Sequence, residues 1–406
     1  SRAWQAVYRG QPERRDTTAM LKYIAKRFGQ IFILFYVFLA LLFLLLDLQP
    51  GDISQQFVGN PNIPPEAKVI MVRQLGLDQP KIVQLGHHLW NYSFGLDMGF
   101  SWSRYPQEVW VILRTALPRT VFLFLSATVL SFWLGFYTGK QVAWRRGTLV
   151  EKSAMVTSIF FWTVFYPWFA ILMLWFFAAQ LGWFPIGKFV TVETWLDAPY
   201  RAQEVFVLML WTIAAATIIY GIARYLIDRS VDDSKTQRSY HRIAFWSIII
   251  LALVIWGLNG RSPYARDILW HTFVPVLTLT LVNFAGTTLL TRSSMLETLR
   301  EDYILTARAK GVPEKTIRDR HAARNAMLPV TTSLVLQLAT VIAGGVITEQ
   351  IFSWPGLGRE LLSAITAEDI PIAMGALALI GILSLLAHLV ADVTYAFLDP
   401  RIRVQG

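Results

Sequence analysis

The residues best suited to polar chemistry are gathered between positions 301 and 330, in the stretch EDYILTARAKGVPEKTIRDRHAARNAMLPV. Four carboxylates, Glu301, Asp302, Glu314 and Asp319, stand there among lysines and arginines. Mixed charges of this kind form ion pairs and charge-assisted hydrogen bonds, which suit the recognition of another macromolecule. Apolar residues also recur at regular intervals in the stretch, so part of it must be buried.

Two helices joined by a tight corner are predicted to hold these charges. Gly311 stands where the first helix must end, because glycine takes the left-handed turn at little cost. Pro313 opens the second helix, with Glu314 near its positive end, and this helix extends to Met327. The first helix is predicted over residues 294–310, where apolar side chains three or four positions apart form one face: Met295, Leu296, Leu299, Tyr303, Ile304 and Ala307.

Two interpretations of this helical corner remain. A basic amphipathic pair of helices can lie on anionic lipid headgroups. Alternatively, the corner is a projecting element that docks on a partner protein in the cytoplasm. The second interpretation is favoured because a helix lying on a surface needs no tight corner. The acidic residues also weaken attraction to anionic lipid.

The sequence offers no arrangement for catalysis or metal binding. It contains no cysteine, which excludes disulfides, Cys-ligated zinc and thiol chemistry. The six histidines are scattered without a helical i, i+4 pair, and no H-E-x-x-H motif occurs. The GK pairs in YTGKQ and PIGKF lack the spacing and the following Ser/Thr of a phosphate-binding loop. We therefore expect no catalytic residue, no metal site and no cofactor bound by this chain.

The composition is that of an integral membrane protein. Hydrophobic residues make up 54% of the 406 residues and charged residues only 16%, below the roughly 25% of soluble domains. The net charge of +10 is typical of Lys and Arg held at a cytoplasmic face, and no nucleic-acid motif accompanies it. Eight membrane helices are predicted, at about 22–48, 118–141, 153–180, 204–227, 243–258, 271–292, 329–353 and 372–397.

The distribution of Lys and Arg predicts the orientation. With the N-terminus inside, 26 of the 37 basic residues fall in segments on the inner side. Both termini are then cytoplasmic, which agrees with an even number of helices. The outer segment that follows the first helix is long, and two short helices are predicted in it, at PPEAKVIMVRQLG and QPKIVQLGHHLWNYSFG.

Several blocks resemble, in order, the permease subunits of ABC importers of the oligopeptide/dipeptide type. The stretch EDYILTARAKGVPEKTIRDRHAARNAMLPV is similar to the cytoplasmic coupling loop of that family. The resemblance covers about residues 20–190 and 265–403. Its other blocks are MLKYIAKRF, LDLQPGD, RQLGLDQP, LGWFPIGK, HTFVPVLTLTL, TRSSMLETLREDY, IFSWPGLG and LDPRIR.

The resemblance implies an all-α type I ABC importer transmembrane domain with six core helices in a prokaryotic inner membrane. The implied partners are a second permease in a pseudo-symmetric heterodimer, two ATPase subunits that bind ATP and Mg, an extracytoplasmic solute-binding protein, and the lipid membrane. No nucleic acid is implied. Because the chain lacks a phosphate-binding loop, ATP hydrolysis belongs to the partner ATPases.

By position in the resembling motif, Gly311 is the hinge glycine of the ATPase-coupling element, whose apolar face would be buried in a groove of the ATPase. Leu305, Thr306 and Ala307 stand where the wider superfamily has Glu-Ala-Ala, and only the last residue matches. Glu301 or Asp302 is the candidate substitute for the missing carboxylate. The predicted coupling residues are Glu301, Asp302, Ala307, Arg308, Ala309, Lys310, Gly311, Arg320, His321, Arg324 and Asn325.

One departure from the family is an insertion at about 195–262, which contributes two of the eight helices as a peripheral hairpin. The predicted boundaries are an extension at 1–19, a first helix at 20–49, an outer loop at 50–112, the transmembrane domain at 113–397 and a tail at 398–406. The aromatic-rich third run contains Pro167, which predicts a kink next to a cavity. Candidate residues of a translocation path are Phe165, Tyr166, Pro167, Trp168, Asn283 and Glu349.

Glu349 has a second explanation, because a carboxylate near the end of a membrane run often snorkels to the interface or caps a helix. The function predicted from these observations is the membrane-spanning part of an importer of peptides. Oligosaccharides are the alternative substrate. A stand-alone secondary transporter is the rival class, and it would require intramembrane ion-binding carboxylates and inverted repeats.

Overall fold

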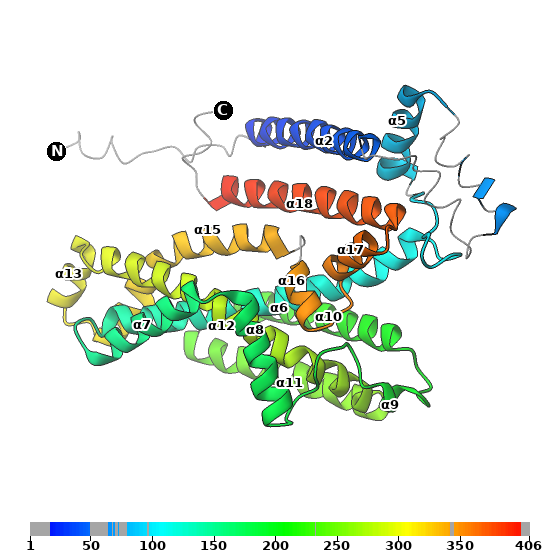
Figure 1. Cartoon of the computed structure of the whole chain (residues 1–406). Helices are drawn as coiled ribbons and strands as arrows, with labels where there is room; N and C mark the ends of the chain where they lie inside the picture. Colours follow the sequence, from blue (N-terminus) through cyan, green and yellow to red (C-terminus); the bar gives the residue numbers. More distant parts are fainter. Residues whose placement is uncertain are drawn as a thin grey trace. The chain divides into compact units, whose positions relative to one another are not determined.

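The structure is a computed structural model, and it describes residues 17–48, 64–66, 68–69, 72, 79–95, 97–231, 233–341 and 345–398. Within these residues the regular structure is helical, apart from an isolated β-bridge between Phe100 and Glu108 (Figure 1). The helices and π-helical segments (η) are α2 (Thr17–Asp47), α5 (Lys81–Trp90), η1 (Asn91–Gly95), α6 (Val109–Trp144), α7 (Leu149–Thr163), α8 (Tyr166–Leu174), η2 (Trp175–Gln180), α9 (Val192–Trp195), α10 (Ala202–Ser230), α11 (Ser234–Leu258), α12 (Ser262–Thr298), α13 (Asp302–Ala309), α14 (Glu314–Thr316), η3 (Ile317–Ala322), α15 (Ala323–Val341), α16 (Val346–Ile351), α17 (Leu357–Thr366) and α18 (Ile370–Leu398).

The backbone forms two compact units. The first comprises the described residues up to Val164 together with 279–347 and 356–398, and the second comprises 165–278 and 348–355. The first unit contains the predicted helical corner. The second contains the predicted inserted hairpin.

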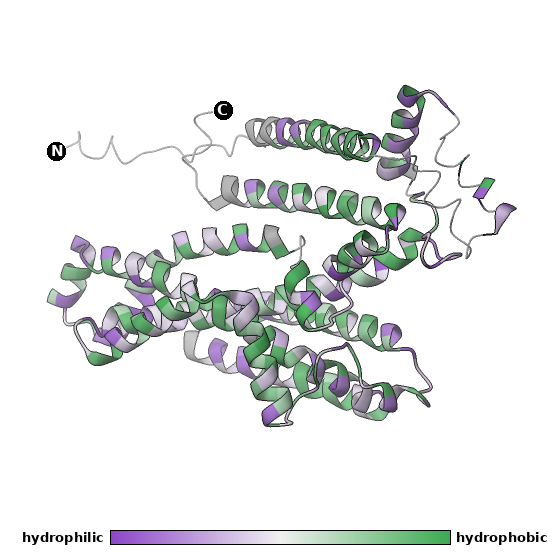
Figure 2. Ribbon diagram, viewed as in Figure 1, coloured by the Kyte–Doolittle hydropathy of each residue, from purple (hydrophilic) through white to green (hydrophobic). Residues whose placement is uncertain are grey.

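The core of the first unit is built around α6, α17 and α18. Val109 and Leu113 of α6 are fully buried and pack with Leu357 of α17 and Ile372 of α18. Gly375 lets these helices approach closely, because a Cβ there would lie 2.8 Å from a methyl group of Val109. Apolar residues of α2 pack on the same α18. Both helices are coloured mostly as hydrophobic in Figure 2.

A second close approach in the first unit joins α6 to the part of α12 after residue 279. Gly135 and Gly139 lie one turn apart on α6, and a Cβ on Gly135 would come within 2.6 Å of the Cβ of Thr287. Between them the hydroxyls of Thr138 and Thr288 lie 2.7 Å apart and share a hydrogen bond. Small residues at this spacing are a common way for membrane helices to pack. The contact fixes α12 at the point where it approaches the corner.

The second unit has an aromatic core. The ring of Phe189 lies 5.4 Å from that of Phe206 in α10 and 5.2 Å from that of Trp354. The backbone amide of Lys188 donates to the carbonyl of Phe352 at 3.0 Å, which ties the loop before α9 to the segment after α16. Gly187, at φ 66°, has no room for a side chain against that carbonyl.

The eight predicted membrane helices are recovered as helical segments, although they do not all have the length and composition of a span. Among the described residues, α2, α6, α10, α11, α12 and α18 are long and apolar enough to cross a membrane. A seventh span arises if the bent pair α7 and α8–η2 crosses as one. The predicted helix at 329–353 corresponds to α15 and α16, which do not meet this standard. Residues 342–344 between them lie outside the described part.

The predicted kink near Pro167 is confirmed. Val164 and Phe165 adopt extended backbone angles between α7 and α8. Pro167 itself lies in the first turn of α8, where its missing N–H costs nothing because the first N–H groups of a helix have no intrahelical partner. The proline therefore opens a new helix rather than bending one from its middle.

The segment predicted to be an insertion forms two packed helices, α10 and α11, as expected. The linker between them is much shorter than expected, because α10 extends to Ser230 and α11 begins at Ser234. Beyond Met209 none of the described hairpin residues is buried within the unit, whereas Val205 and Phe206 near its base are. The base of the hairpin is therefore part of the core of the second unit.

Of the two short helices predicted after the first span, the second is present as α5 followed by η1. The first lies largely outside the described residues. The predicted extension at 1–19 and the tail at 398–406 also lie almost wholly outside them.

Candidate functional site: the helical corner at Gly311

The corner at Gly311 has the predicted geometry. After α13 the chain turns through Gly311 at φ 71°, the left-handed conformation that glycine adopts readily. The amide of Gly311 donates to the carbonyl of Arg308 at 2.9 Å, and that of Val312 donates to Ala307 at 3.1 Å. These bonds close the end of α13. Pro313 is the N-cap of α14, so this helix begins at Glu314, one residue later than predicted.

The prediction of one continuous helix over 294–310 is wrong. Helix α12 ends at Thr298, and α13 starts at Asp302 after an extended Glu301. Acidic residues favour the positive end of a helix, so Glu301 and Asp302 mark a start rather than a middle. The apolar spacing continues across the break, because Met295 and Ile304 pack in the same cluster.

The apolar side of the corner is buried within the first unit itself. Met295, Ile304, Ile317 and Ala326 are completely inaccessible and pack with Ala143 of α6. The expectation that this face is buried in a groove of an ATPase is therefore wrong for these residues. Their regular spacing reflects anchoring to α6 and α12, and a partner can reach only the other side of the corner.

Ion pairs reinforce the anchor. The carboxylate of Asp319 in η3 lies 3.0 Å from Nζ of Lys140 on α6, and it accepts two hydrogen bonds from Arg318 at 2.8 and 2.9 Å. Arg318 also donates to Oε1 of Gln141 at 3.2 Å. The hydrogen bonds from Arg318, aided by Lys140, hold the pKa of Asp319 far below its usual range. These contacts attach η3 to the end of α6.

A second ion pair, less exposed than the first, lies nearby between α7 and α12. Nε of Arg292 donates to Oε1 of Glu151 at 2.9 Å, and the other carboxylate oxygen accepts from the backbone amide of Gly147. Both side chains are largely withdrawn from solvent. The pair joins the turn between α6 and α7 to α12, close to the point where α12 leads into the corner.

The outward side of the corner carries most of the predicted coupling residues. Ala307 and His321 are half-buried, and Asn325 donates to the hydroxyl of Tyr303 at 2.8 Å. Neither Glu301 nor Asp302 makes an ion pair within the described residues. Asp319, and not either of these, is therefore the carboxylate that anchors the corner. The exposed predicted residues are Glu301, Asp302, Arg308, Ala309, Lys310, Gly311, Arg320, Arg324 and Asn325.

The predicted translocation residues are divided between the two units. Phe165, Tyr166, Pro167, Trp168 and Glu349 belong to the second unit, and Asn283, which is exposed, belongs to the first.

Within the second unit, the hydroxyl of Tyr166 accepts a hydrogen bond from Thr348 at 2.8 Å. The adjacent Glu349 is completely buried, so the snorkelling explanation is wrong for it. Phe165 and Trp168 are exposed.

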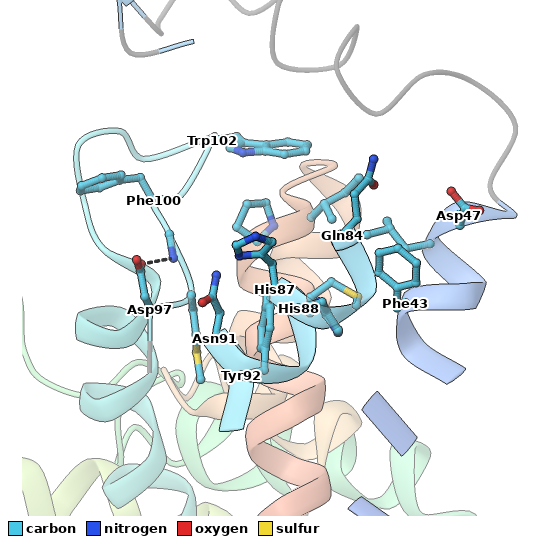
Figure 3. A pocket seen from close by; sticks show the side chains of 16 residues that line it. Phe43, Asp47, Gln84, His87, His88, Asn91, Tyr92, Asp97, Phe100 and Trp102 are labelled. Atoms are coloured by element: carbon cyan, nitrogen blue, oxygen red, sulfur yellow. Dashed lines mark hydrogen bonds between the residues drawn. The ribbon is translucent and has the colours of Figure 1, made fainter. Parts of the chain in front are cut away.

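A small pocket in the first unit lies among α2, α5–η1, the loop at 97–102 and the start of α18 (Figure 3). The ring of His88 lies between those of Phe43 and Tyr92, at 5.6 and 4.4 Å. Burial lowers the pKa of His88 to about 4, although a hydrogen bond with the backbone of Leu39 opposes this, so the ring is neutral at neutral pH. The cavity volume of about 80 Å³ is smaller than the ~150 Å³ that holds benzene. It is too small for a peptide.

The sequence revealed the apolar residues Met295 and Ile304 that anchor the corner, but not the polar pairs that reinforce it. Gln141 and Arg318 are separated by 177 positions, and Glu151 and Arg292 by 141. The one available signal was Asp319, a lone acid among basic residues. Its partner Lys140 could not be identified without the fold.

The fold and the corner define a class: a multi-pass helical membrane protein with a short charged element anchored to its long helices. Comparison with known proteins gives the family. Residues 238–404 match the family described as "Binding-protein-dependent transport system inner membrane component". The di/tripeptide transport system permease protein DppB of Pseudomonas aeruginosa is 31% identical over 95% of this chain and 100% of its own length. The dipeptide transport system permease protein DppB of Escherichia coli K12 is 30% identical over 95% and 99%.

The chain belongs to this family of binding-protein-dependent inner-membrane transport components. The resemblance detected in the sequence is therefore confirmed, and so is the predicted fold class, an all-helical type I ABC importer transmembrane domain.

Proposed function

We propose that this chain is the permease subunit of an ATP-driven importer and forms the translocation path for short peptides. The single observation that carries the substrate class is the end-to-end similarity to two relatives named as dipeptide and di/tripeptide permeases. An extracytoplasmic binding protein delivers the solute, and both termini of this chain lie in the cytoplasm.

The helical corner is the element that docks on a partner ATPase. Two features support this role. Its exposed side offers a mixture of charges, including Asp302, Arg308 and Lys310, to a complementary protein surface. Its other side is fixed to the long helices by the buried cluster around Ile304 and by Asp319. A surface that receives force on one side and is firmly attached on the other can transmit that force.

The transmission has two routes in the first unit. Asp319 connects the corner to α6 through Lys140. Met295 connects it to α12, and Arg292 of α12 in turn holds α7 through Glu151. When the ATPases bind ATP and close, displacement of the corner therefore moves α6, α7 and α12 together.

The remaining partners are a second permease and a second ATPase, with ATP and Mg bound on the ATPases. The path would be lined in part by Phe165, Tyr166, Pro167, Trp168, Asn283 and Glu349. The buried carboxylate of Glu349, beside the Tyr166–Thr348 hydrogen bond, is the most direct candidate for contact with a polar group of the solute.

The test is uptake into proteoliposomes that contain the complete complex. We expect ATP-dependent accumulation of a labelled dipeptide when the binding protein is present. Uptake of an oligosaccharide in place of the dipeptide would overturn the substrate class. Uptake by this chain without an ATPase, driven by an ion gradient, would overturn the importer mechanism in favour of a secondary transporter.

A further inference from the structure

A shallow groove runs along one face of α11 in the inserted hairpin. It has a volume of about 470 Å³. Its lining residues recur at three- and four-residue intervals and therefore share one side of the helix. They are Ser239, Arg242, Ile243, Trp246, Ser247 and Ile250.

The groove changes character along its length. Arg242 and Ser239 occupy one end, and Ile250 lies at the other, about 12 Å further along at the helical rise. Ile243, Trp246 and Ile250 are each more than half exposed. A charged end followed by an apolar strip that contains a tryptophan matches the profile of one leaflet of a membrane from headgroup to acyl chain.

The acidic groups described at the tip of the hairpin already have partners. Asp228 pairs with His241 at 2.9 Å and with Arg224 at 3.9 Å. Asp233 accepts from the amide and the hydroxyl of Thr236 at 3.0 and 2.5 Å.

Two arginines near the start of α11, in contrast, have no acidic partner among the described residues. Arg238 and Arg242 are exposed, lie one helical turn apart and make no ion pair within the described residues. Arg242 lines the polar end of the groove, and Arg238 lies one turn before it on the same helix. Two guanidinium groups without an ion pair among the described residues attract an anion at this end.

We propose that this face of α11 binds an anionic phospholipid of the surrounding membrane. Arg242 and Arg238 contact the phosphate, and an acyl chain lies along Ile243, Trp246 and Ile250. The apolar strip distinguishes this ligand from free phosphate, which would use only the charged end. The guanidinium pair distinguishes it from a zwitterionic lipid, whose own ammonium already neutralises its phosphate. The bound phospholipid would thereby attach the hairpin of the second unit to the surrounding membrane without a covalent bond.

The test is native mass spectrometry of the full-length chain released from detergent, titrated with phosphatidylglycerol or with phosphatidylethanolamine. We expect preferential retention of phosphatidylglycerol, and its apparent affinity should fall about fivefold for each of Arg242→Gln and Arg238→Gln. Arg242→Lys should retain most of the affinity. Trp246→Ala should weaken binding of both lipids, because the apolar strip serves both.

The matched control is Arg224→Gln. It removes the same charge from the same end of the hairpin, but that guanidinium is paired with Asp228 and does not line the groove. We expect less than a twofold change. An equal loss in Arg224→Gln and Arg242→Gln would contradict a specific site and indicate attraction by bulk charge.

Two further outcomes would overturn the proposal. One is unchanged phosphatidylglycerol binding in Arg242→Gln. The other is displacement of the lipid by millimolar inorganic phosphate, which would assign the charged end to a free anion. If Arg242→Gln fails to fold, the comparison of the two lipids and the phosphate competition, both on the unaltered chain, still decide.

Discussion

The helical corner and the inserted hairpin show opposite relations between sequence and burial. The corner is short and charged, yet Ile304 and Ile317 within it are completely buried. The hairpin is long and apolar, yet the most apolar window of α11 has no buried residue. In a membrane protein an apolar side chain can face the lipid without being buried in the protein, so a long apolar run indicates a membrane span. Apolar residues within a charged segment indicate instead that the segment packs into a protein core.

The largest difference between the two regions is expected from matched isoleucine substitutions. Ile304→Ala removes a fully buried side chain and should lower the free energy of unfolding by about 2–5 kcal/mol. Ile219→Ala, at a position 52% exposed on α10, should change it by less than about 0.5 kcal/mol. Unfolding of the chain in mixed micelles, followed by tryptophan fluorescence, measures both values. Equal effects would show that burial does not distinguish the regions.

The next largest effect is expected at the corner itself. A side chain at Gly311 meets no atom within 4 Å, so the cost of Gly311→Val is backbone strain alone, about 1–2 kcal/mol. The strain should shift the corner and reduce dipeptide uptake more than ATP hydrolysis in the assembled complex. The ratio of uptake to hydrolysis is the measurement.

Asparagine supplies the control, because it tolerates the left-handed conformation. Gly311→Asn should therefore retain most of the coupling. If Gly311→Val transports with the unaltered ratio, the conformation of the corner does not matter for coupling.

A smaller effect is expected from the anchoring ion pair. Asp319 is about one-third exposed, so Asp319→Asn should cost less than about 1 kcal/mol. Because the pKa of Asp319 is lowered in the folded state, its contribution is present above the unfolded value of about 3.9 and is lost as the pH falls through the lower folded value. The difference in stability between the unaltered chain and Asp319→Asn should thus be constant from about pH 5 to 8 and decline below about pH 4.

Lys140→Gln tests whether this contribution arises from the pair. Its effect and that of Asp319→Asn should be less than additive in the double variant, since both remove one interaction. Full additivity would show that Asp319 stabilises the corner through Arg318 alone.

The smallest effect is expected from shortening the hairpin. Nε1 of Trp256 donates to the hydroxyl of Thr212 at 3.2 Å, so α10 and α11 are adjacent at this level and a short Gly/Ser linker can join 213 to 255. Removal of 214–254 should leave the melting temperature and the assembly with partners nearly unchanged, as size-exclusion chromatography with fluorescence detection can measure. Removal of the whole insertion, 196–262, should be harmful because it deletes Phe206 from the aromatic core.

Local sequence chemistry predicted the helices and the corner. Gly311 could be assigned because the constraint on its backbone is carried by one residue, and Pro167 predicted a kink for the same reason. The end of α12 at Thr298 was missed because apolar spacing continued through it, and the acidic pair after it was interpreted as part of the coupling element. The pairing of Asp319 with Lys140 could not be predicted, because Lys140 is adjacent to it only once α6 and η3 have packed.

The central claim, that the outer side of the corner meets an ATPase, can be tested directly because the natural chain contains no cysteine. Leu305, 55% exposed on α13, and Leu253, 66% exposed on α11, are matched positions for single cysteines. In the assembled complex, a short bifunctional thiol–amine reagent should join Leu305→Cys to the ATPase and leave Leu253→Cys unjoined. Absence of the ATPase adduct at Leu305→Cys, or an equal yield at Leu253→Cys, would contradict the account.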